Sequence, residues 1–380
     1  MAYILEIVTA VPEYLVSKDE LVEFYSRSMG SAGSDRINQK LTFLNRKTKI
    51  QKRYSCIPDF NGAEFELFTG SDFNPPVEKR TKVYKEKILP LASKAIDKLL
   101  AQTKVKPNEI THLITVSCTG LFAPGFEFLV SEFYGLQHTE KLALNFLGCY
   151  AALKALKHAK YIADASPEAC ILIVSAELCS LHFSPSTSDE EIVANLLFAD
   201  GAAAAFVCGN ECKYGQNKIT LKIDKIGSSY IPDTLQLMTW NISSSAFKMY
   251  LNKHIVKAIE ENILPVVNEF LEGKTSDYWA IHPGGVKILQ AVKESLGLAD
   301  EDVEDSFSIL QHYGNMSSPT ILFVLKRIVD KIKSNEPLEH KRIFSCAFGP
   351  GLSVEMVGFS TVPASQSGKY NIHKNHAIEI

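Results

Sequence analysis

Three residues stand where they could do chemistry, and the first is a cysteine. In the stretch "NFLGCYAALKAL", an apolar run stops at Gly148, Cys149 follows, and an alanine-rich helical pattern begins at once. The start of a helix carries partial positive charge and free N–H groups, which favour a thiolate. Free cysteine is also among the most frequently buried residue types. The local sequence therefore fits either a nucleophile or a small buried side chain.

The other two candidates are a histidine and an asparagine beside glycine-rich loops. His282 ends an apolar run and precedes Pro-Gly-Gly, where its ring could pair with a thiolate or simply hydrogen-bond to the loop. Asn315, in "HYGNMSS", offers two N–H donors and cannot deprotonate, which suits an oxyanion or enolate. Asparagine is also an ordinary turn residue. The loop "FGPG" (348–351) would let the backbone approach a ligand closely, or be a plain turn.

Alternating strands and helices are expected to position these residues. Helices are predicted from Cys149 to about Ala163, from Val286, and after Ser318-Pro319, where serine caps the helix and proline takes its first position. Each candidate would then lie at the end of a buried strand, where α/β sheets bind ligands. The strands are predicted at 1–15, 112–120, 142–146, 169–177, 201–209, 277–281, 307–312 and on either side of "FGPG".

The two halves of the chain follow one plan. The interval from Cys118 to Cys149 is nearly as long as that from His282 to Asn315, and each runs from a strand end to a glycine before a helix. "FADG" (198–201) likewise matches "FGPG". This repeat predicts a duplicated, layered α/β fold. We expect a first half at 1–215 carrying the cysteine, a second half at 216–362 carrying the histidine and asparagine, and a loose polar tail at 363–380.

Composition restricts the function classes. The chain has 380 residues, 46% of them hydrophobic, and a formal net charge of −3, which argues against nucleic acid as a partner. No apolar run approaches the ~20 residues of a membrane helix, and the first residues carry no basic leader. Eight cysteines are scattered through apolar segments, which predicts reduced thiols and a cytoplasmic protein. Cys208 and Cys212 have no second pair or histidine nearby, so no metal site is expected.

Four motifs together resemble one enzyme family. "GCYAAL", "AIHPGG", "YGNMSSP" and "AFGPG", in this order, are similar to the type III polyketide synthases, the chalcone-synthase-like enzymes. The resemblance extends from about residue 3 to about 362, and "SCTGLFAPG" is closer to the bacterial branch of the family. It implies a thiolase-like fold with duplicated α-β-α-β-α halves, a homodimer, and no cofactor beyond coenzyme A thioesters as substrates.

The resemblance also implies a reaction. Cys149 would take an acyl starter from coenzyme A, and His282 and Asn315 would hold the thioester carbonyl of malonyl-CoA while it loses CO2. His282 would in addition form an ion pair with the thiolate. The resulting enolate would attack the acyl-cysteine in a Claisen condensation. Repeated cycles and ring closure would give a pyrone, resorcinol or phloroglucinol, from a fatty, small aliphatic or malonyl starter.

Further family positions carry over one residue at a time. Phe198 matches the phenylalanine between the reaction cavity and the coenzyme A tunnel. Met249 stands at the second gatekeeping aromatic, next to Phe247, and predicts a more yielding passage because methionine is flexible. His182 replaces a cavity threonine, and any cavity position could equally be ordinary core packing. The remaining cavity positions carried over are Cys118, Thr119, Cys179, Ser317, Gly349 and Pro350.

A basic stretch, "NRKTKIQKRY" (45–54), matches the coenzyme A entrance of the family. Lys47, Lys52 and Arg53 are candidates for binding the phosphates as charge partners. The same stretch could also be a solvated helix face with no ligand.

Three other functions remain open at this point. A ketoacyl synthase III-like enzyme, which condenses once and uses acyl carrier protein, also relies on Cys, His and Asn, but its histidine usually begins a sequence like H-Q-A-N. A thioester hydrolase or cysteine protease would explain a Cys–His pair, but not Asn315 or the "FGPG" loop. A non-catalytic module would not require all three reactive residues.

Overall fold

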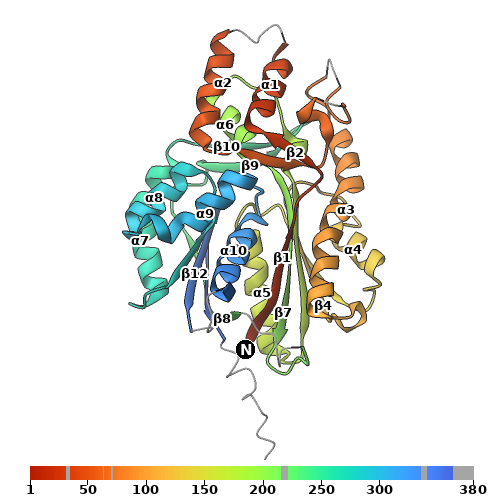
Figure 1. Ribbon diagram of the computed structural model, residues 1–380, viewed down its shortest axis with the longest axis vertical. Coiled ribbons are helices and arrows are strands. Elements are labelled where there is room, and N and C mark those ends of the chain that lie inside the picture. Colours follow the sequence, from red (N-terminus) through yellow and green to blue (C-terminus); the bar gives the residue numbers. More distant parts are fainter. Residues whose placement is uncertain (31–34, 63, 70–71, 215–220, 335–339, 363–380) are drawn as a thin grey trace, which may run out of the picture.

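The computed structural model describes residues 1–30, 35–62, 64–69, 72–214, 221–334 and 340–362. Its centre is one nine-stranded mixed sheet with the order β11-β12-β13-β8-β1-β7-β6-β4-β5 (Figure 1). The strands are β1 (Ala2–Ala10), β4 (His112–Ser117), β5 (Glu140–Asn145), β6 (Cys170–Leu178), β7 (Asp200–Gly209), β8 (Leu221–Tyr230), β11 (Tyr278–Ile281), β12 (Arg342–Gly349) and β13 (Ser353–Thr361).

The strand order repeats from the centre outward. β1 and β8 pair over only a few residues, from Ala2 to Ile4 on β1. On one side of this junction β7 and β6 are antiparallel neighbours, and β4 then runs parallel to β6. On the other side β13 and β12 are antiparallel neighbours, and β11 then runs parallel to β12. "FADG" leads into β7 and "FGPG" into β13, so the two motifs occupy matching places in the two halves.

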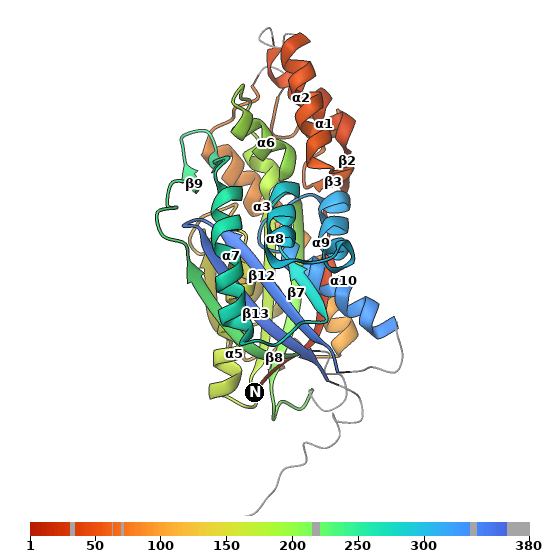
Figure 2. The ribbon, with the colours of Figure 1, turned by 90° about the vertical axis from the view of Figure 1, so that its left-hand side faces the viewer.

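Helices cover both half-sheets and fill the space between them. α3 (Val77–Thr103) and α4 (Phe126–Tyr134) pack outside the first half, and α7 (Ile255–Leu271) and α8 (Val286–Leu296) outside the second. α5 (Ala151–Ala165) and α10 (Thr320–Ser334) share the core between them. Figure 2 shows α7 lying across β12 and β13. The expected α-β-α-β-α layering is thereby confirmed.

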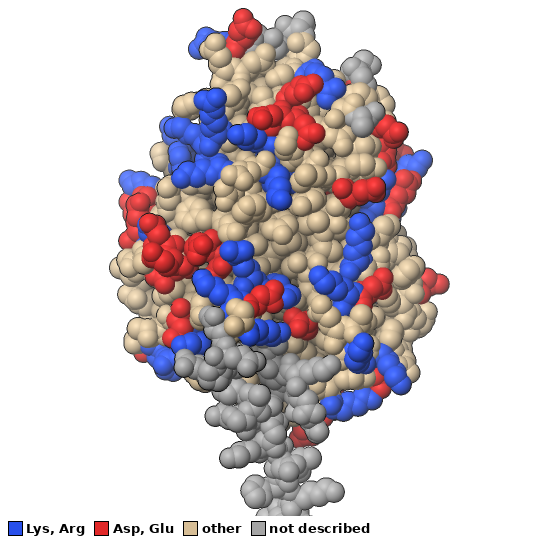
Figure 3. Space-filling model, in the orientation of Figure 1, with Lys and Arg blue, Asp and Glu red and all other residues tan. Residues whose placement is uncertain are grey.

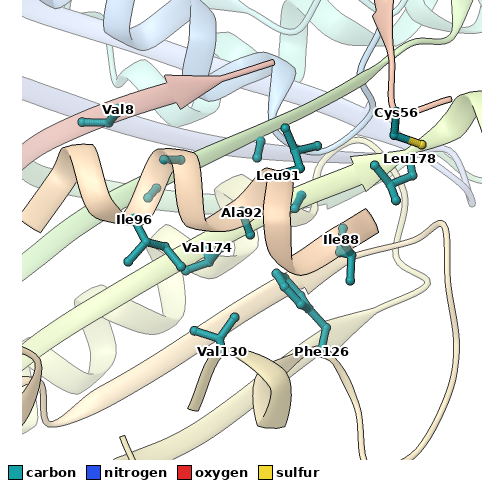
Figure 4. Close-up of a cluster of buried hydrophobic side chains, with 14 of the residues drawn as sticks. Val8, Cys56, Ile88, Leu91, Ala92, Ile96, Phe126, Val130, Val174 and Leu178 are labelled. Atoms are coloured by element: carbon teal, nitrogen blue, oxygen red, sulfur yellow. The ribbon is translucent and has the colours of Figure 1, made fainter. Parts of the chain in front are cut away.

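In the outer core of the first half, each strand contributes every second side chain. Leu91, Ala92 and Ile96 of α3 meet Val8 of β1 and Val174 of β6 (Figure 4). The neighbouring strand residues face the opposite core because side chains alternate along a strand. β6 is therefore buried on both faces, as its continuous apolar sequence predicts.

The central helix α5 is alanine-rich on its buried face, so it fits between the half-sheets. The side chain of Lys157, on this helix, is also buried. The Nζ atom of Lys157 donates to Glu355 Oε2 of β13 at 2.6 Å and to the Gly227 carbonyl of β8 at 3.0 Å. This ion pair ties the helix of the first half to strands of the second. Breaking such a pair on one side is costly because the remaining charge stays buried.

One expected strand is wrong. Residues 307–312 belong to helix α9 (Asp300–Tyr313), and His312 therefore lies near a helix end. Buried Val303, Ser306 and Leu310 recur at helical spacing, and three acidic residues fill the first turn. A short apolar run is ambiguous between strand and helix, and here the acidic residues before it were the better signal. Among the described residues, no strand of the second half corresponds to β5.

Smaller elements stand at the end of the molecule that carries the site. They are β2 (Tyr14–Ser17), α1 (Lys18–Ser28), α2 (Asp35–Thr48), β3 (Lys52–Ser55), α6 (Asp189–Leu197), β9 (Met238–Ile242) and β10 (Phe247–Leu251). β2 pairs with β3, and β9 with β10, as two-stranded sheets. The predicted half boundary near 215 and the predicted tail at 363–380 lie outside the described residues.

Candidate active site

The cysteine loop of the first half packs directly against the "FGPG" loop of the second. Gly148 adopts a φ of +91°, and a Cβ placed there would lie 2.6 Å from the Cδ of Pro350. A Cβ at Gly349 would overlap the ring of Tyr150. Only glycine permits this close approach at both positions. The cysteine loop of the first half and the "FGPG" loop of the second half are thus in contact on both sides of Cys149.

Cys149 is buried, and its Sγ lies 4.0 Å from both Oδ1 and Nδ2 of Asn315. Burial raises the pKa of the Cys149 thiol to about 11, hydrogen bonds from Ser317 and Asn315 lower it, and the charge of Glu177 raises it. α5 begins only at Ala151. In this structure burial therefore outweighs the helix-start effect that the sequence predicts.

His282 follows β11, and its backbone N–H donates to the Cys346 carbonyl at 2.8 Å. Its ring is buried, and within the described part of the chain neither Nδ1 nor Nε2 has a hydrogen-bond partner. Burial lowers the pKa of His282 to about 3, so the imidazole is neutral. Burial thus disfavours the charged imidazolium that the implied ion pair with Cys149 would require. The ring instead offers two uncommitted nitrogens.

Asn315 is held by its backbone and by its side chain. Its N–H donates to the Leu197 carbonyl at 2.9 Å, and its carbonyl accepts from Ala199 N–H at 2.9 Å, so the segment pairs with Phe198 as a short parallel bridge. The Oδ1 atom accepts from Ser317 N–H at 2.8 Å, and Nδ2 lies 3.4 Å from the Gly284 carbonyl in the loop after His282. Asn315 thus joins the Cys149 and His282 loops, although it follows a helix and not a strand.

Glu177, at the end of β6, is a residue that the sequence analysis did not select. It is fully buried and accepts hydrogen bonds from Cys118 N–H and Thr119 Oγ1, each at 2.8 Å, and from Ser318 Oγ. Burial raises the pKa of this carboxyl. Glu177 therefore links the loop after β4 to the loop that carries Asn315. A charged residue inside a continuous apolar strand was the signal that could have identified it.

Asp200, at the start of β7, is a second buried carboxyl. Its oxygens accept from Ser180 N–H at 2.7 Å, Ser180 Oγ at 2.6 Å and Cys56 N–H at 2.8 Å. Burial raises the pKa of Asp200 to about 6, against the lowering effect of these hydrogen bonds. Ser180 lines the cavity described next, so Asp200 fixes part of its wall.

A cavity of about 60 Å³ lies under α6 and β10. Four residues assigned to it from the sequence, Phe198, Met249, Cys179 and His182, line it, together with Arg53, Ser180, Trp240 and Phe247, among others. Cys118 lies nearby in the Cys149 region, since its Sγ accepts from Gly148 N–H at 3.0 Å.

His182 is part of an aromatic cluster in that cavity. Its ring stacks on Phe247 with centroids 4.3 Å apart, and Trp240 meets both rings edge-on. Nδ1 accepts from Phe247 N–H at 3.1 Å, so Nε2 is the nitrogen that donates to the Thr119 carbonyl, at 2.7 Å. Burial lowers the pKa of His182 to about 3. This histidine is a neutral wall residue whose orientation is fixed by two backbone partners.

The basic residues near the predicted entrance divide into two groups. Lys47, at the end of α2, is exposed and stands over the Phe43 ring at 4.5 Å, and Lys52 is half-buried. Figure 3 shows lysines and arginines gathered around this end of α2. Arg53 instead is buried, its Nη1 donates to the Phe198 carbonyl at 3.2 Å, and burial lowers its pKa to about 9. It does not face the surface where a phosphate would approach.

Within the described ranges, no group of three or more histidine, cysteine or acidic side chains is arranged to hold a metal ion. Cys212 instead lies beside Cys170, with the two Sγ atoms 3.1 Å apart. No helix within those same ranges combines the length and apolarity that a membrane crossing requires.

Comparison with known proteins identifies the family. Residues 1–211 match the model of the N-terminal domain of chalcone and stilbene synthases, and residues 222–363 match the model of their C-terminal domain. The chain belongs to the chalcone and stilbene synthase family. As a type III polyketide synthase it is an acyltransferase. A putative chalcone synthase of Bacillus subtilis (strain 168) is 31% identical over 375 residues, which cover 95% of this chain and 99% of the relative. Type III polyketide synthase A of Arabidopsis thaliana is 28% identical, over 93% and 91%.

Solved structures agree with this assignment. The type III polyketide synthase described here superposes on PKS-I of the brown alga Ectocarpus siliculosus with a TM-score of 0.88 and 26% identity, over 95% of this chain and 98% of the other. It superposes on 1,3,6,8-tetrahydroxynaphthalene synthase of Streptomyces coelicolor A3(2), a bacterial type III polyketide synthase, with a TM-score of 0.83 and 25% identity, over 94% and 99%. The thiolase-like fold is confirmed.

Proposed function

We propose that the enzyme loads an acyl group from an acyl-CoA starter onto Cys149 and extends it with malonyl-CoA. The observation that carries this proposal is the position of Asn315, whose amide lies 4.0 Å from Cys149 Sγ and 3.4 Å from the His282 loop at Gly284. A nucleophile and a non-ionisable donor therefore share one buried site. In loading, Cys149 Sγ forms a bond to the starter carbonyl carbon, the bond to the coenzyme A sulfur breaks, and the thiol proton goes to the leaving thiolate through neutral His282.

Extension needs an enolate, and the site is suited to hold one. When malonyl-CoA loses CO2, the electron pair of the broken C–C bond passes to the thioester oxygen, which then requires hydrogen-bond donors. Asn315 Nδ2 supplies one donor and the ring of His282, whose nitrogens are uncommitted, supplies the other. The enolate carbon attacks the acyl-Cys149 carbonyl, the cysteine leaves as a thiolate, and the lengthened chain stays on coenzyme A. Reloading onto Cys149 repeats the cycle.

The cavity wall is proposed to decide how the chain is closed into a pyrone, resorcinol or phloroglucinol-type ring. Phe198 and Met249 separate this space from the tunnel in our assignment, and both line it. Cys179 and His182 line it too. Cys118, Thr119, Ser317, Gly349 and Pro350 are assigned to the reaction cavity by the family resemblance but are not among the residues that line this space. The flexible Met249 favours an aliphatic starter.

The substrates and the setting follow from the same residues. Lys47 and Lys52 stand where they can pair with coenzyme A phosphates, and the proposed chemistry requires no other cofactor. All eight cysteines are buried and free of disulfides, which fits the reducing cytoplasm.

A second copy of the chain is the proposed partner. β5 is an edge strand of the large sheet, and edge strands invite pairing. Beside it, α4 exposes Phe128 and Phe133 at 52% and 63%. A symmetric contact of these surfaces would cover both, as expected for a homodimer.

One assay tests the function. The purified chain is incubated with malonyl-CoA and a panel of acyl-CoA starters, and the products are identified by mass spectrometry. Ring-closed polyketides that disappear in Cys149→Ala support the proposal. His282→Ala and Asn315→Ala should each slow CO2 release from malonyl-CoA, and normal release in both would remove their assigned roles. Free acid as the sole product would favour a thioester hydrolase. One condensation that depends on acyl carrier protein would favour a ketoacyl synthase III-like enzyme.

A further inference from the structure

We propose that Arg53 is a positioning residue that fixes the backbone at Phe198 and, through it, the amide of Asn315. The proposal rests on the proposed role of Asn315 in holding the enolate. It replaces the phosphate contact that the sequence suggests for Arg53.

The side chain of Arg53 points into the protein. Along β3 the burial alternates, so Arg53 and Ser55 face inward while Lys52 and Tyr54 do not. Only 4% of Arg53 is exposed, and Nη1 donates to the Phe198 carbonyl at 3.2 Å. Among the described residues, Nε and Nη2 have no hydrogen-bond partner and no carboxylate forms an ion pair with the guanidinium.

Stabilisation of the fold does not explain why an arginine is buried at position 53. A buried charge without a counter-charge is expensive, and a well-packed apolar residue of similar size usually costs the fold less. The single strong contact of Arg53 is with a main-chain carbonyl next to the site.

The segment around Phe198 is held from two sides. Leu197 O and Ala199 N–H face Asn315 and make the two bonds of the bridge, each 2.9 Å long. In an extended segment alternate carbonyls point in opposite directions, so the carbonyl of Phe198 points away from Asn315 and is received by Arg53.

The packing at Gly314 leaves this contact little freedom. A Cβ at Gly314 would lie 3.0 Å from the Leu197 carbonyl oxygen and 3.7 Å from the Arg53 Cβ. β3, the end of α6 and the loop of Asn315 therefore meet at one point. Removing the Arg53 contact frees one side of the Phe198 segment, which lines the cavity and is bridged on its other side to the backbone of Asn315.

The test separates positioning from phosphate binding by using two substrates. CO2 release is measured from malonyl-CoA and from the malonyl thioester of N-acetylcysteamine, which has no phosphate, for the wild-type protein, Arg53→Met, Arg53→Lys and Lys52→Met. A displaced donor lowers turnover without weakening uniform binding. We expect Arg53→Met to lower kcat by about 10- to 100-fold on both substrates, with KM changed by less than about twofold. Arg53→Lys, whose ammonium can donate to the same carbonyl, should recover part of this loss.

Lys52→Met provides the contrast, because it should raise KM for malonyl-CoA alone. A rise in KM for malonyl-CoA alone in Arg53→Met, with normal kcat, would show a phosphate contact and overturn the proposal. An unchanged kcat on both substrates would overturn it as well. The melting temperature of Arg53→Met should stay within about 3 °C of wild type, because the lost contact and the removed buried charge offset each other.

A second measurement does not depend on activity. Hydrogen exchange of peptides covering Ala199 and Asn315 should be faster in Arg53→Met than in wild type, and intermediate in Arg53→Lys. Unchanged protection at both amides would overturn the positioning role even if turnover falls. If the wild-type protein releases no CO2 from either substrate, the proposed function fails, while the exchange result still decides what Arg53 holds.

Discussion

The Sγ of Cys149 lies 4.0 Å from both Oδ1 and Nδ2 of Asn315. Ser317 N–H donates to Oδ1 at 2.8 Å and thereby fixes which way the amide points. The N–H donors of Asn315 are therefore directed by the backbone of the same loop. A substitution that keeps the shape of this side chain but removes its N–H donors therefore tests whether the enzyme uses those donors.

Asn315→Asp is such a change. We expect CO2 release from malonyl-CoA to fall by about 100- to 1000-fold, because an enolate loses a donor and meets a negative charge instead. The new carboxylate should also raise the pKa of Cys149 further and slow its alkylation by iodoacetamide at pH 8. Asn262→Asp, on α7, is the matched control and should behave like wild type. Normal CO2 release in Asn315→Asp would show that the amide donors are not used.

Much of this arrangement was predictable because it depends on local patterns. Continuous apolar runs predicted the buried strands β6 and β7. The Ser318-Pro319 signal predicted the start of α10 to within one residue, but α10 begins at Thr320 and the Ser318 hydroxyl bonds to Glu177 instead of capping the helix. Cys149 and Asn315 could be paired from the duplication, since the repeat places their loops in corresponding positions. The contact between Gly148 and Pro350 was not predicted, because the repeat matches "FGPG" with "FADG" and not with the cysteine loop.

What the sequence did not predict depends on long-range burial. The orientation of Arg53 cannot be read from a basic stretch, because "KIQKRY" looks the same whether its arginine faces solvent or the Phe198 carbonyl. Glu177 takes its partners from two loops that are distant from it in sequence. The raised pKa of Cys149 has the same origin, since the helix start is local and visible whereas the burial that outweighs it is tertiary.

Gly148 should be intolerant of a side chain for two reasons that can be measured separately. Gly148→Ala places a Cβ 2.6 Å from Pro350 Cδ and also strains a φ of +91°. Gly135→Ala has a similar φ of +69° but no atom within 4 Å, so it reports backbone strain alone, about 1 kcal/mol. We expect Gly148→Ala to lower the free energy of unfolding clearly more than Gly135→Ala and to abolish polyketide formation. Equal losses in urea unfolding would mean that the "FGPG" loop moves away freely.

Asp200 should give stability a dependence on pH. Its pKa is raised to about 6 in the folded protein, from an ordinary value near 3.8. Between these values the folded state holds a proton that the unfolded state lacks, so stability falls as pH rises from about 4 to 6 and this contribution levels off above it. The full effect is at most about 3 kcal/mol.

The comparison of Asp200→Asn with wild type isolates that contribution. The variant cannot titrate, so its melting temperature relative to wild type should rise between pH 4 and pH 6 and then stay constant. Ser180→Ala removes a hydrogen bond that lowers the pKa of Asp200, and it should extend the pH-dependent range upward. A constant difference across the range would show that Asp200 is ionised throughout.

Met249 should set the size of starter that enters the cavity. It lines the cavity together with Phe198, and its thioether can bend where a ring cannot. Met249→Phe should lower kcat/KM for a long fatty acyl-CoA by about tenfold or more relative to acetyl-CoA, whereas Met249→Ala should shift the same ratio toward the long starter. The measurement is competition between the two starters with products counted by mass spectrometry. Tyr250→Phe, the next residue on β10 and 40% exposed, is the control and should leave the ratio unchanged. If both Met249 variants also leave it unchanged, the passage that selects the starter lies elsewhere on the wall.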